Sequence, residues 1–305
     1  MAAYLDPRSG QTFPIDTPRW CGADHAPLLL TPLPGITRDA IETSERSLWR
    51  YRAALPLPVA DPISMGEGCT PLITRRLHGA EVRIKCEWFM PTGSFKDRGA
   101  SVMLSLLRQQ GVRAVLEDSS GNGGAAVAAY AAAGGMQATI MAPSSTSPAK
   151  TVQMRAHGAA VELIPGNRQA TSDAAVARAN AVFYASHNWQ PFFLQGTKTL
   201  AYELWEDLGF RAPDNVIVPC GAGSNVLGCE IGFAELLRAG EIAAATLDLA
   251  RAGIYVEPTA AQPSAALARL LESGAITPEQ TTVLVMTGSG LKATPRIAEL
   301  LGVAL

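Results

Sequence analysis

Three glycine-bearing loops contain the residues of this sequence that are best suited to chemistry. The first, residues 91–99, reads Pro-Thr-Gly-Ser-Phe-Lys-Asp-Arg-Gly and places Lys96 at the mouth of an expected helix. A lysine at a helix start is usually a solvated surface group, because helix N-termini attract anions. If the loop is buried, the same lysine loses its proton readily and can form a Schiff base. Lys96 is therefore a candidate nucleophile.

The second and third loops each follow an expected strand and open an expected helix. Residues 118–124 read Asp-Ser-Ser-Gly-Asn-Gly-Gly, whose amides and hydroxyls could hold a carboxylate. Residues 219–225 read Pro-Cys-Gly-Ala-Gly-Ser-Asn, with glycines that let backbone amides surround a phosphate. The Gly-x-Gly-x-x-Gly dinucleotide pattern is not satisfied, because Val226 stands at the third glycine position. Taken alone, each loop is also compatible with a plain turn.

Short apolar segments alternate with helical segments from Val82 onward, which predicts βαβ units and a mostly parallel sheet. Ligands of such sheets bind beyond the carboxyl ends of the strands, and the loops lie at strand ends. We expect strands at residues 82–86, 114–117, 138–141, 160–164, 216–219 and 282–286. We expect helices at residues 101–110, 125–133, 149–157, 172–183, 199–208 and 227–239. Residues 1 to about 65 are rich in proline, and we expect a wrapping arm with one helix near residues 41–52.

Composition and charge exclude several classes of protein. A length of 305 residues is enough for one large core or two moderate ones. The net charge of −2 gives no basic surface for nucleic acid or an anionic membrane, so neither partner is expected. The N-terminus lacks the features of a signal peptide, and we expect a cytoplasmic protein. Five cysteines without a Cys-x-x-Cys pair suggest neither disulfides nor a zinc site, and Cys21 with His25 is too small a ligand set for a metal.

In combination, these motifs closely resemble the pyridoxal-phosphate enzymes of fold type II, and within them the threonine synthase family. The resemblance runs from Phe13-Pro14 through Gly-Glu-Gly-Cys-Thr-Pro-Leu at residues 66–72 to Leu291-Lys292, and includes Thr-Gly-Ser-Gly at residues 287–290. It implies an α/β fold with the tryptophan synthase β-like architecture, in which two three-layer αβα domains have parallel-rich sheets. Residues 1–98 and 196–305 would form the larger cofactor domain, and residues 99–195 the smaller substrate-side domain. A homodimer with pyridoxal 5'-phosphate in the cleft is expected.

The resemblance also implies a role for each residue of the site. Lys96 would hold the cofactor through a Schiff base and then remove the α proton of the substrate. Thr287 would face the pyridine nitrogen with a neutral hydroxyl, which favours elimination and replacement over transamination. The other expected cofactor contacts are Phe95, Asn122 at the ring hydroxyl, and the phosphate loop Gly221, Ala222, Gly223, Ser224 and Asn225. The expected substrate contacts are Ser119, Ser120 and Gly121 at the carboxylate, with Gly123, His187, Asn188 and Lys198.

The sequence differs from the family pattern at positions expected to bind a substrate phosphate. The family stretch typically reads Asn-Ser-x-Asn-Pro-x-Arg-Leu-Glu-Gly-Gln-Lys-Thr, whereas residues 187–199 read His-Asn-Trp-Gln-Pro-Phe-Phe-Leu-Gln-Gly-Thr-Lys-Thr. Phe193 therefore occupies the arginine position, and Gly123 stands where a threonine usually follows the asparagine. A buried phosphate needs paired charge. A phosphorylated substrate would then require other donors, for which the candidates are Arg98, Arg155, His187 and Lys198.

Several functions are compatible with these observations. The leading hypothesis is an elimination or replacement at the β or γ carbon of an amino acid, with the threonine synthase reaction on O-phosphohomoserine as the nearest named activity. The rival enzymes are a β-replacing synthase of the cysteine or cysteate synthase type, and a serine or threonine dehydratase. Family members usually carry several dozen more residues where this chain has only Ala243-Ala244-Ala245. If a wall of the active site is thereby missing, the chain would be a non-catalytic cofactor-binding homologue.

Overall fold

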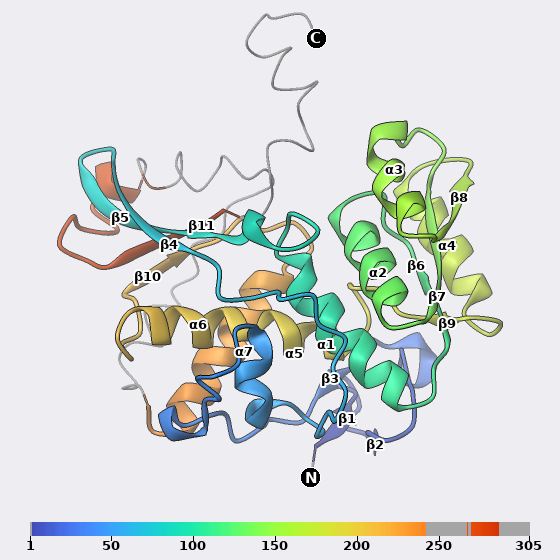
Figure 1. Cartoon of the computed structure of the whole chain (residues 1–305), viewed down its shortest axis with the longest axis horizontal. Coiled ribbons are helices and arrows are strands. Elements are labelled where there is room, and N and C mark those ends of the chain that lie inside the picture. Colours follow the sequence, from blue (N-terminus) through green and yellow to red (C-terminus); the bar gives the residue numbers. More distant parts are fainter. Residues whose placement is uncertain (1, 242–266, 268–269, 287–305) are drawn as a thin grey trace, which may run out of the picture.

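A computed structural model gives the structure at residues 2–241, 267 and 270–286 (Figure 1). Two four-stranded sheets organise these residues, and a small three-stranded sheet lies near the N-terminus. The first four-stranded sheet has the order β10-β11-β5-β4, with β4 at Leu72–Leu77, β5 at Ala80–Cys86, β10 at Asn215–Ile217 and β11 at Thr282–Met286. The strands β10, β11 and β5 run parallel, and β4 pairs antiparallel with β5. The β4–β5 hairpin turns at His78 and Gly79, whose φ angles of 50° and 85° suit a two-residue turn.

The second sheet is parallel throughout and has the order β8-β7-β6-β9. Its strands are β6 at Ala114–Glu117, β7 at Gln137–Pro143, β8 at Ala160–Ile164 and β9 at Phe183–Tyr184. The connecting helices are α2 at Asn122–Ala133, α3 at Pro148–Ala156 and α4 at Arg168–Arg178. Alanine makes α2 a strong helix former, and small side chains let it approach the sheet closely. A Cβ atom on Gly124 of α2 would lie only 2.3 Å from the carbonyl oxygen of Ser119.

Helix α1 (Lys96–Gln109) lies between the two sheets and packs against α5 (Pro191–Thr197) (Figure 1). The two helices touch where each has a glycine. A Cβ on Gly196 would lie 2.0 Å from the carbonyl oxygen of Arg98, and a Cβ on Gly99 would lie 2.4 Å from the Phe193 ring. The helices α6 (Thr199–Asp207) and α7 (Ser224–Arg238) pack against each other beside the first sheet. The α1–α5 contact fixes the position of Lys96 at the start of α1.

We expect Gly196→Ala to lower the free energy of unfolding by about 3 kcal/mol, because its new methyl group would overlap the backbone of α1. Urea unfolding followed by circular dichroism measures this loss. Gly121→Ala is the control, since a Cβ there meets no described atom within 4 Å. Equal stabilities of the two variants would show that the α1–α5 contact is looser than the structure indicates.

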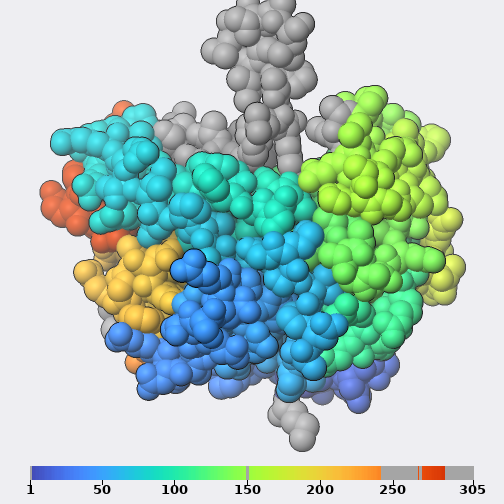
Figure 2. Space-filling model, viewed as in Figure 1, coloured from blue at the N-terminus to red at the C-terminus, as the bar shows by residue number. Residues whose placement is uncertain are grey.

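The N-terminal segment forms the small antiparallel sheet from β1 (Ala3–Leu5), β2 (Thr12–Pro14) and β3 (Leu29–Leu30). Its remaining regular elements are the 3-10 helices Ala23–His25, Arg38–Ala40 and Leu48–Ala54. The blue atoms of this segment spread over the lower part of the molecule in Figure 2. Tyr4 and Trp49 are fully buried, so the segment contributes to the core as the expected wrapping arm.

The structure confirms the expected α/β fold class and every expected strand, with shifts at some ends. Three expectations were wrong in detail. Helix α1 begins at Lys96 instead of residue 101, the expected helix at residues 172–183 ends at Arg178 with β9 following, and the helix near residues 41–52 is the 3-10 helix Leu48–Ala54. The domain boundaries expected after residues 98 and 195 stay a prediction. Another 3-10 helix, Glu87–Phe89, precedes the Lys96 loop.

Candidate active site

Lys96 lies half-buried in the first turn of α1, facing the start of α7. Its Nζ donates a hydrogen bond of 3.3 Å to Ser224 Oγ. Two aromatic rings flank the ammonium group, with centroids 4.7 Å away at Phe95 and 5.3 Å away at Phe193. These contacts bring together the first and third loops identified from the sequence.

Burial lowers the pKa of Lys96 to about 8, and the negative charge of Glu117 opposes this shift in part. With a pKa near 8, about a tenth of the side chain is the neutral amine at pH 7 and about nine tenths at pH 9. The neutral amine is the form that attacks a carbonyl group. The environment therefore activates Lys96 as a nucleophile at physiological pH.

The rate at which cofactor-free protein binds pyridoxal phosphate through Lys96 should rise about tenfold from pH 7 to pH 9 and level off above pH 8. Stopped-flow absorption in the visible range measures this rate. Nα-acetyl-lysine is the control, and its rate should rise about a hundredfold over the same range because an unperturbed lysine has a pKa near 10.4. A protein profile parallel to that of the free amine would contradict the lowered pKa.

The third loop forms an open cradle at the start of α7. Gly223 has a φ of 84°, the left-handed conformation that favours glycine, and it immediately precedes the helix. A Cβ on Gly221 or Gly223 would meet no described atom within 4 Å, so space surrounds the backbone amides. The helix N-terminus and these amides suit an anion. Ser224 and Asn225 are buried in the first turn, whereas Gly221 and Ala222 are exposed.

Three buried polar atoms near this cradle lack hydrogen-bond partners among the described residues. They are Ser94 Oγ and both amide atoms of Asn225, Oδ1 and Nδ2. Buried polar groups in folded proteins nearly always have a partner. These atoms are therefore suited to a bound molecule.

The second loop follows β6 and opens α2 at Asn122. Ser119 is buried, Ser120 is half-buried and Gly121 is exposed. The Gly121 amide donates to Ser119 Oγ over 3.4 Å. The loop places backbone amides at the N-terminus of a twelve-residue helix, which is suited to a carboxylate.

The parallel pairing of β6 with β9 places His187 beside this loop, because the carboxyl ends of paired parallel strands meet. His187 Nδ1 lies 2.8 Å from Glu117 Oε1, and the His187 amide donates to Glu117 Oε2 over 3.0 Å. The same Nδ1 lies 2.8 Å from where a Cβ on Gly123 would be. The His187 ring also packs on Phe193 with centroids 5.7 Å apart.

The structure does not bring Lys198 to the predicted substrate contacts. Its ammonium group is fully buried, donates to Glu235 Oε1 over 3.0 Å and to the Ala54 carbonyl over 2.8 Å, and is thereby fixed among α6, α7 and the N-terminal segment. The prediction of a substrate contact for Lys198 is therefore corrected to a structural ion pair. Asn188 is exposed on the loop after β9, and Thr287 lies outside the described residues.

Glu117 and Ser94 are site residues that the sequence analysis did not identify. Glu117 ends an expected strand, and a carboxylate at the carboxyl end of a parallel strand is a recognisable signal. Ser94 lies in the Lys96 loop, but only its burial without a partner distinguishes it from an ordinary turn serine. The orientation of both side chains depends on contacts far along the chain.

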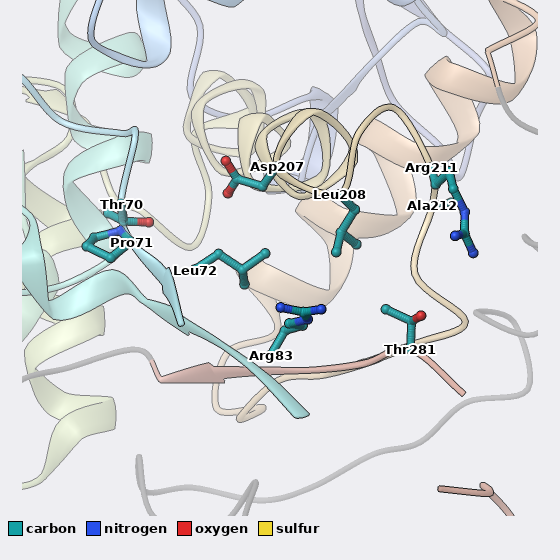
Figure 3. Close-up of a pocket in the computed structure, with 9 residues that line it drawn as sticks. All are labelled: Thr70, Pro71, Leu72, Arg83, Asp207, Leu208, Arg211, Ala212 and Thr281. Atoms are coloured by element: carbon teal, nitrogen blue, oxygen red, sulfur yellow. The ribbon is translucent and has the colours of Figure 1, made fainter. Parts of the chain in front are cut away.

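A cavity of about 500 Å³ lies elsewhere, between the β4–β5 hairpin and the end of α6 (Figure 3). Its lining residues are Thr70, Pro71, Leu72, Arg83, Asp207, Leu208, Arg211, Ala212 and Thr281. None of the predicted site residues lines it. Within the described part of the chain there is no metal-ligand cluster of three or more His, Cys, Asp or Glu residues, and no helix long and apolar enough to cross a membrane.

The sequence of this chain matches a known protein family. Residues 63–240, more than half of the chain, match the family described as pyridoxal-phosphate dependent enzyme. The chain belongs to this family. Among curated proteins, the threonine synthase of Methanosarcina acetivorans is 31% identical over 266 residues, covering 83% of this chain and 62% of that protein. The threonine synthase of Methanocaldococcus jannaschii is 28% identical over 337 residues, covering 84% of this chain and 83% of that protein.

Solved structures of fold type II enzymes share the architecture of this chain. An O-ureido-L-serine synthase aligns with a TM-score of 0.62 at 22% identity, covering 77% of this chain and 94% of that one. Maize serine racemase aligns with a TM-score of 0.60 at 18% identity, covering 77% and 93%. The chain spans less than two thirds of the Methanosarcina relative.

Pyridoxal 5'-phosphate is the cofactor of this family, and the described residues fit it. Lys96 offers an amine with a lowered pKa, and the cradle at residues 221–225 offers amides for the phosphate. The partnerless atoms of Ser94 and Asn225 are polar groups that a bound cofactor can satisfy. Phe95 packs beside Lys96, where it can cover one side of an aromatic ring.

Proposed function

We propose that this protein catalyses elimination or replacement at the β or γ carbon of an amino acid, with Lys96 as the residue that holds pyridoxal phosphate. One observation carries the proposal: Lys96 lies between two aromatic rings, 3.3 Å from the serine that opens the phosphate cradle. When bound, the cofactor supplies an electron sink that stabilises negative charge at the α carbon of the substrate.

Each residue of the site has a separate role in this reaction. The amine of Lys96, with its pKa near 8, takes and returns the proton at the α carbon. The loop at residues 119–121 receives the substrate carboxylate at the start of α2. By the family resemblance, Asn122 would contact the cofactor ring hydroxyl, and Thr287, which lies outside the described residues, would contact its pyridine nitrogen. Phe95 and Phe193 shield the amine from water.

Within this class, the name of the curated relatives points to the threonine synthase reaction on O-phosphohomoserine. Phe193 and Gly123, which stand where the family has donors for the substrate phosphate, argue against that substrate. The rival reactions are β-replacement on an activated serine and dehydration of serine or threonine. The protein is further proposed to be a homodimer in the cytoplasm. Light scattering after size-exclusion chromatography gives the number of subunits.

The test is a panel of amino acids added to the purified protein loaded with pyridoxal phosphate. Visible absorption reports binding, and assays for 2-keto acid, threonine and replacement products report turnover. Product from any member of the panel, with a matching spectral change, supports the proposal. Spectral changes without product from every member would indicate the non-catalytic homologue.

A further inference from the structure

Three departures from the family pattern meet at one point beside Lys96. His187 Nδ1 occupies the space that a side chain at position 123 would need, since a Cβ there would lie 2.8 Å away. The His187 ring packs on Phe193, whose centroid is 5.3 Å from the Lys96 ammonium. Gly123, His187 and Phe193 therefore form one packed unit. The absence of a side chain at position 123 makes room for the His187 ring, which in turn packs on Phe193.

Of the other three residues considered as donors for a substrate phosphate, two are held in buried ion pairs and one is exposed. Arg98 is fully buried and donates to Glu87 and Glu203 over 2.8 Å at each contact. Lys198 is buried against Glu235. Arg155 is exposed on α3 and its Nη2 lies 3.5 Å from the Val161 carbonyl. Of the four candidate donors, His187 is the one that packs against the substrate loop, at Gly123.

Glu117 determines what His187 can receive. Its carboxylate is fully buried and accepts from both the backbone amide and Nδ1 of His187. The His187–Glu117 pair therefore has a net charge of zero or −1, depending on whether the ring is protonated. A phosphate dianion at this point would lie beside the buried carboxylate of Glu117 and would meet no net positive charge from the pair, which is costly. The Nε2 atom has no bond to a described residue. With Nδ1–H donating to Glu117, Nε2 accepts a hydrogen bond from a substrate hydroxyl when the ring is neutral and donates one to an ester carbonyl oxygen when the ring is protonated.

We propose, resting on the function proposed above, that His187 held by Glu117 is the specificity-determining residue for the substrate side chain. It selects amino acids whose β or γ carbon has a hydroxyl or a carboxylic ester, and the site rejects phosphate esters. Glu117 is the positioning residue that orients the ring. Phe193 supplies the apolar wall where a phosphate-binding enzyme has a cation.

The experiment compares matched pairs of ligands on the pyridoxal-phosphate-loaded protein. The pairs are L-serine and O-acetyl-L-serine against O-phospho-L-serine, and L-homoserine and O-acetyl-L-homoserine against O-phospho-L-homoserine. Dissociation constants come from visible absorption, and kcat/KM from product. We expect the wild type to prefer the best unphosphorylated ligand at least a hundredfold.

Variants then test the packed unit. Gly123→Thr alone should weaken binding of every ligand, because its side chain collides with His187. Adding His187→Asn should relieve this defect, and adding Phe193→Arg should reverse the preference toward phosphate esters at least tenfold. His157→Asn, at the end of α3, is the control and should change nothing.

The outcomes separate this inference from the proposed function. Comparable kcat/KM values for phosphorylated and unphosphorylated substrates, unchanged by His187→Asn, overturn the inference and leave the function standing. If no amino acid gives product, the proposed function fails, and the dissociation constants alone decide the inference. Failure of every unphosphorylated ligand to bind also overturns it.

Discussion

Lys96→Ala removes the visible absorption of bound pyridoxal phosphate and lowers turnover by about a thousandfold or more, because it deletes both the cofactor-holding amine and the proton-transfer group. Among the lysines whose side chains the structure describes, Lys96 alone lies in the site. Two of the four other lysines, Lys85 and Lys198, are fully buried in ion pairs with carboxylates. The remaining two are Lys150 and Lys292.

The matched control is Lys96→Arg, which keeps a positive charge between the aromatic rings but cannot form the bond to the cofactor. We expect it to fold and to lack the band as Lys96→Ala does. Ser224→Ala should keep the band, since it removes only one hydrogen bond of 3.3 Å to the amine. A normal band in Lys96→Ala would reject this lysine as the attachment point.

Arg98→Met should lower the free energy of unfolding by about 3–5 kcal/mol, because the buried carboxylate of Glu87 loses its ion-pair partner and that of Glu203 keeps only Lys85. Arg98 binds Glu87 through Nε and Nη2 and Glu203 through Nη1. Glu203 also accepts from Lys85 at 2.6 Å and from the amides of Cys69 and Thr70. The network joins α1, α6 and the first sheet directly behind Lys96.

Urea unfolding of Arg98→Met and Arg108→Met compares the loss of stability from a buried and an exposed ion pair on the same helix, α1. Arg108 also pairs with a carboxylate, but Asp61 is 87% exposed, so its loss should cost at most about 1 kcal/mol. Equal losses in the two variants would contradict the structural role of the buried network.

The same network predicts sensitivity to acid. Burial would raise the pKa of Glu203, but Arg98 and Lys85 outweigh burial and hold this pKa well below its usual range. The stability from this group is therefore present above its unfolded-state pKa of about 4.3 and is lost as the pH falls below it.

Local patterns were sufficient for most of the fold. The strands Ala114–Glu117, Ala160–Ile164 and Thr282–Met286 are short apolar runs between turns, and both ends of each were predicted correctly. The two-residue strand Phe183–Tyr184 has no pattern of its own and exists through its pairing with β6. Helix α5, Pro191–Thr197, was not predicted although Gln190 and Pro191 provide a typical helix start.

Long-range contacts account for what the sequence could not predict in the site. The sequence analysis placed Lys198 among the substrate contacts, yet its partner Glu235 lies on another helix, 37 residues further along the chain. The meeting of Glu117 with His187 spans 70 residues and depends on the pairing of β6 with β9. The order of the glycine-bearing motifs, by contrast, was sufficient for the family resemblance that implies the role of Lys96.

The measurement that tests the central claim most directly is peptide mapping after borohydride reduction of the pyridoxal-phosphate-loaded protein. Reduction makes the bond between cofactor and lysine permanent, so mass spectrometry can locate it. We predict that the label is found on Lys96 alone among the five lysines. Label on Lys85, Lys150, Lys198 or Lys292, or no label at all, would contradict the assignment of the active site to the start of α1.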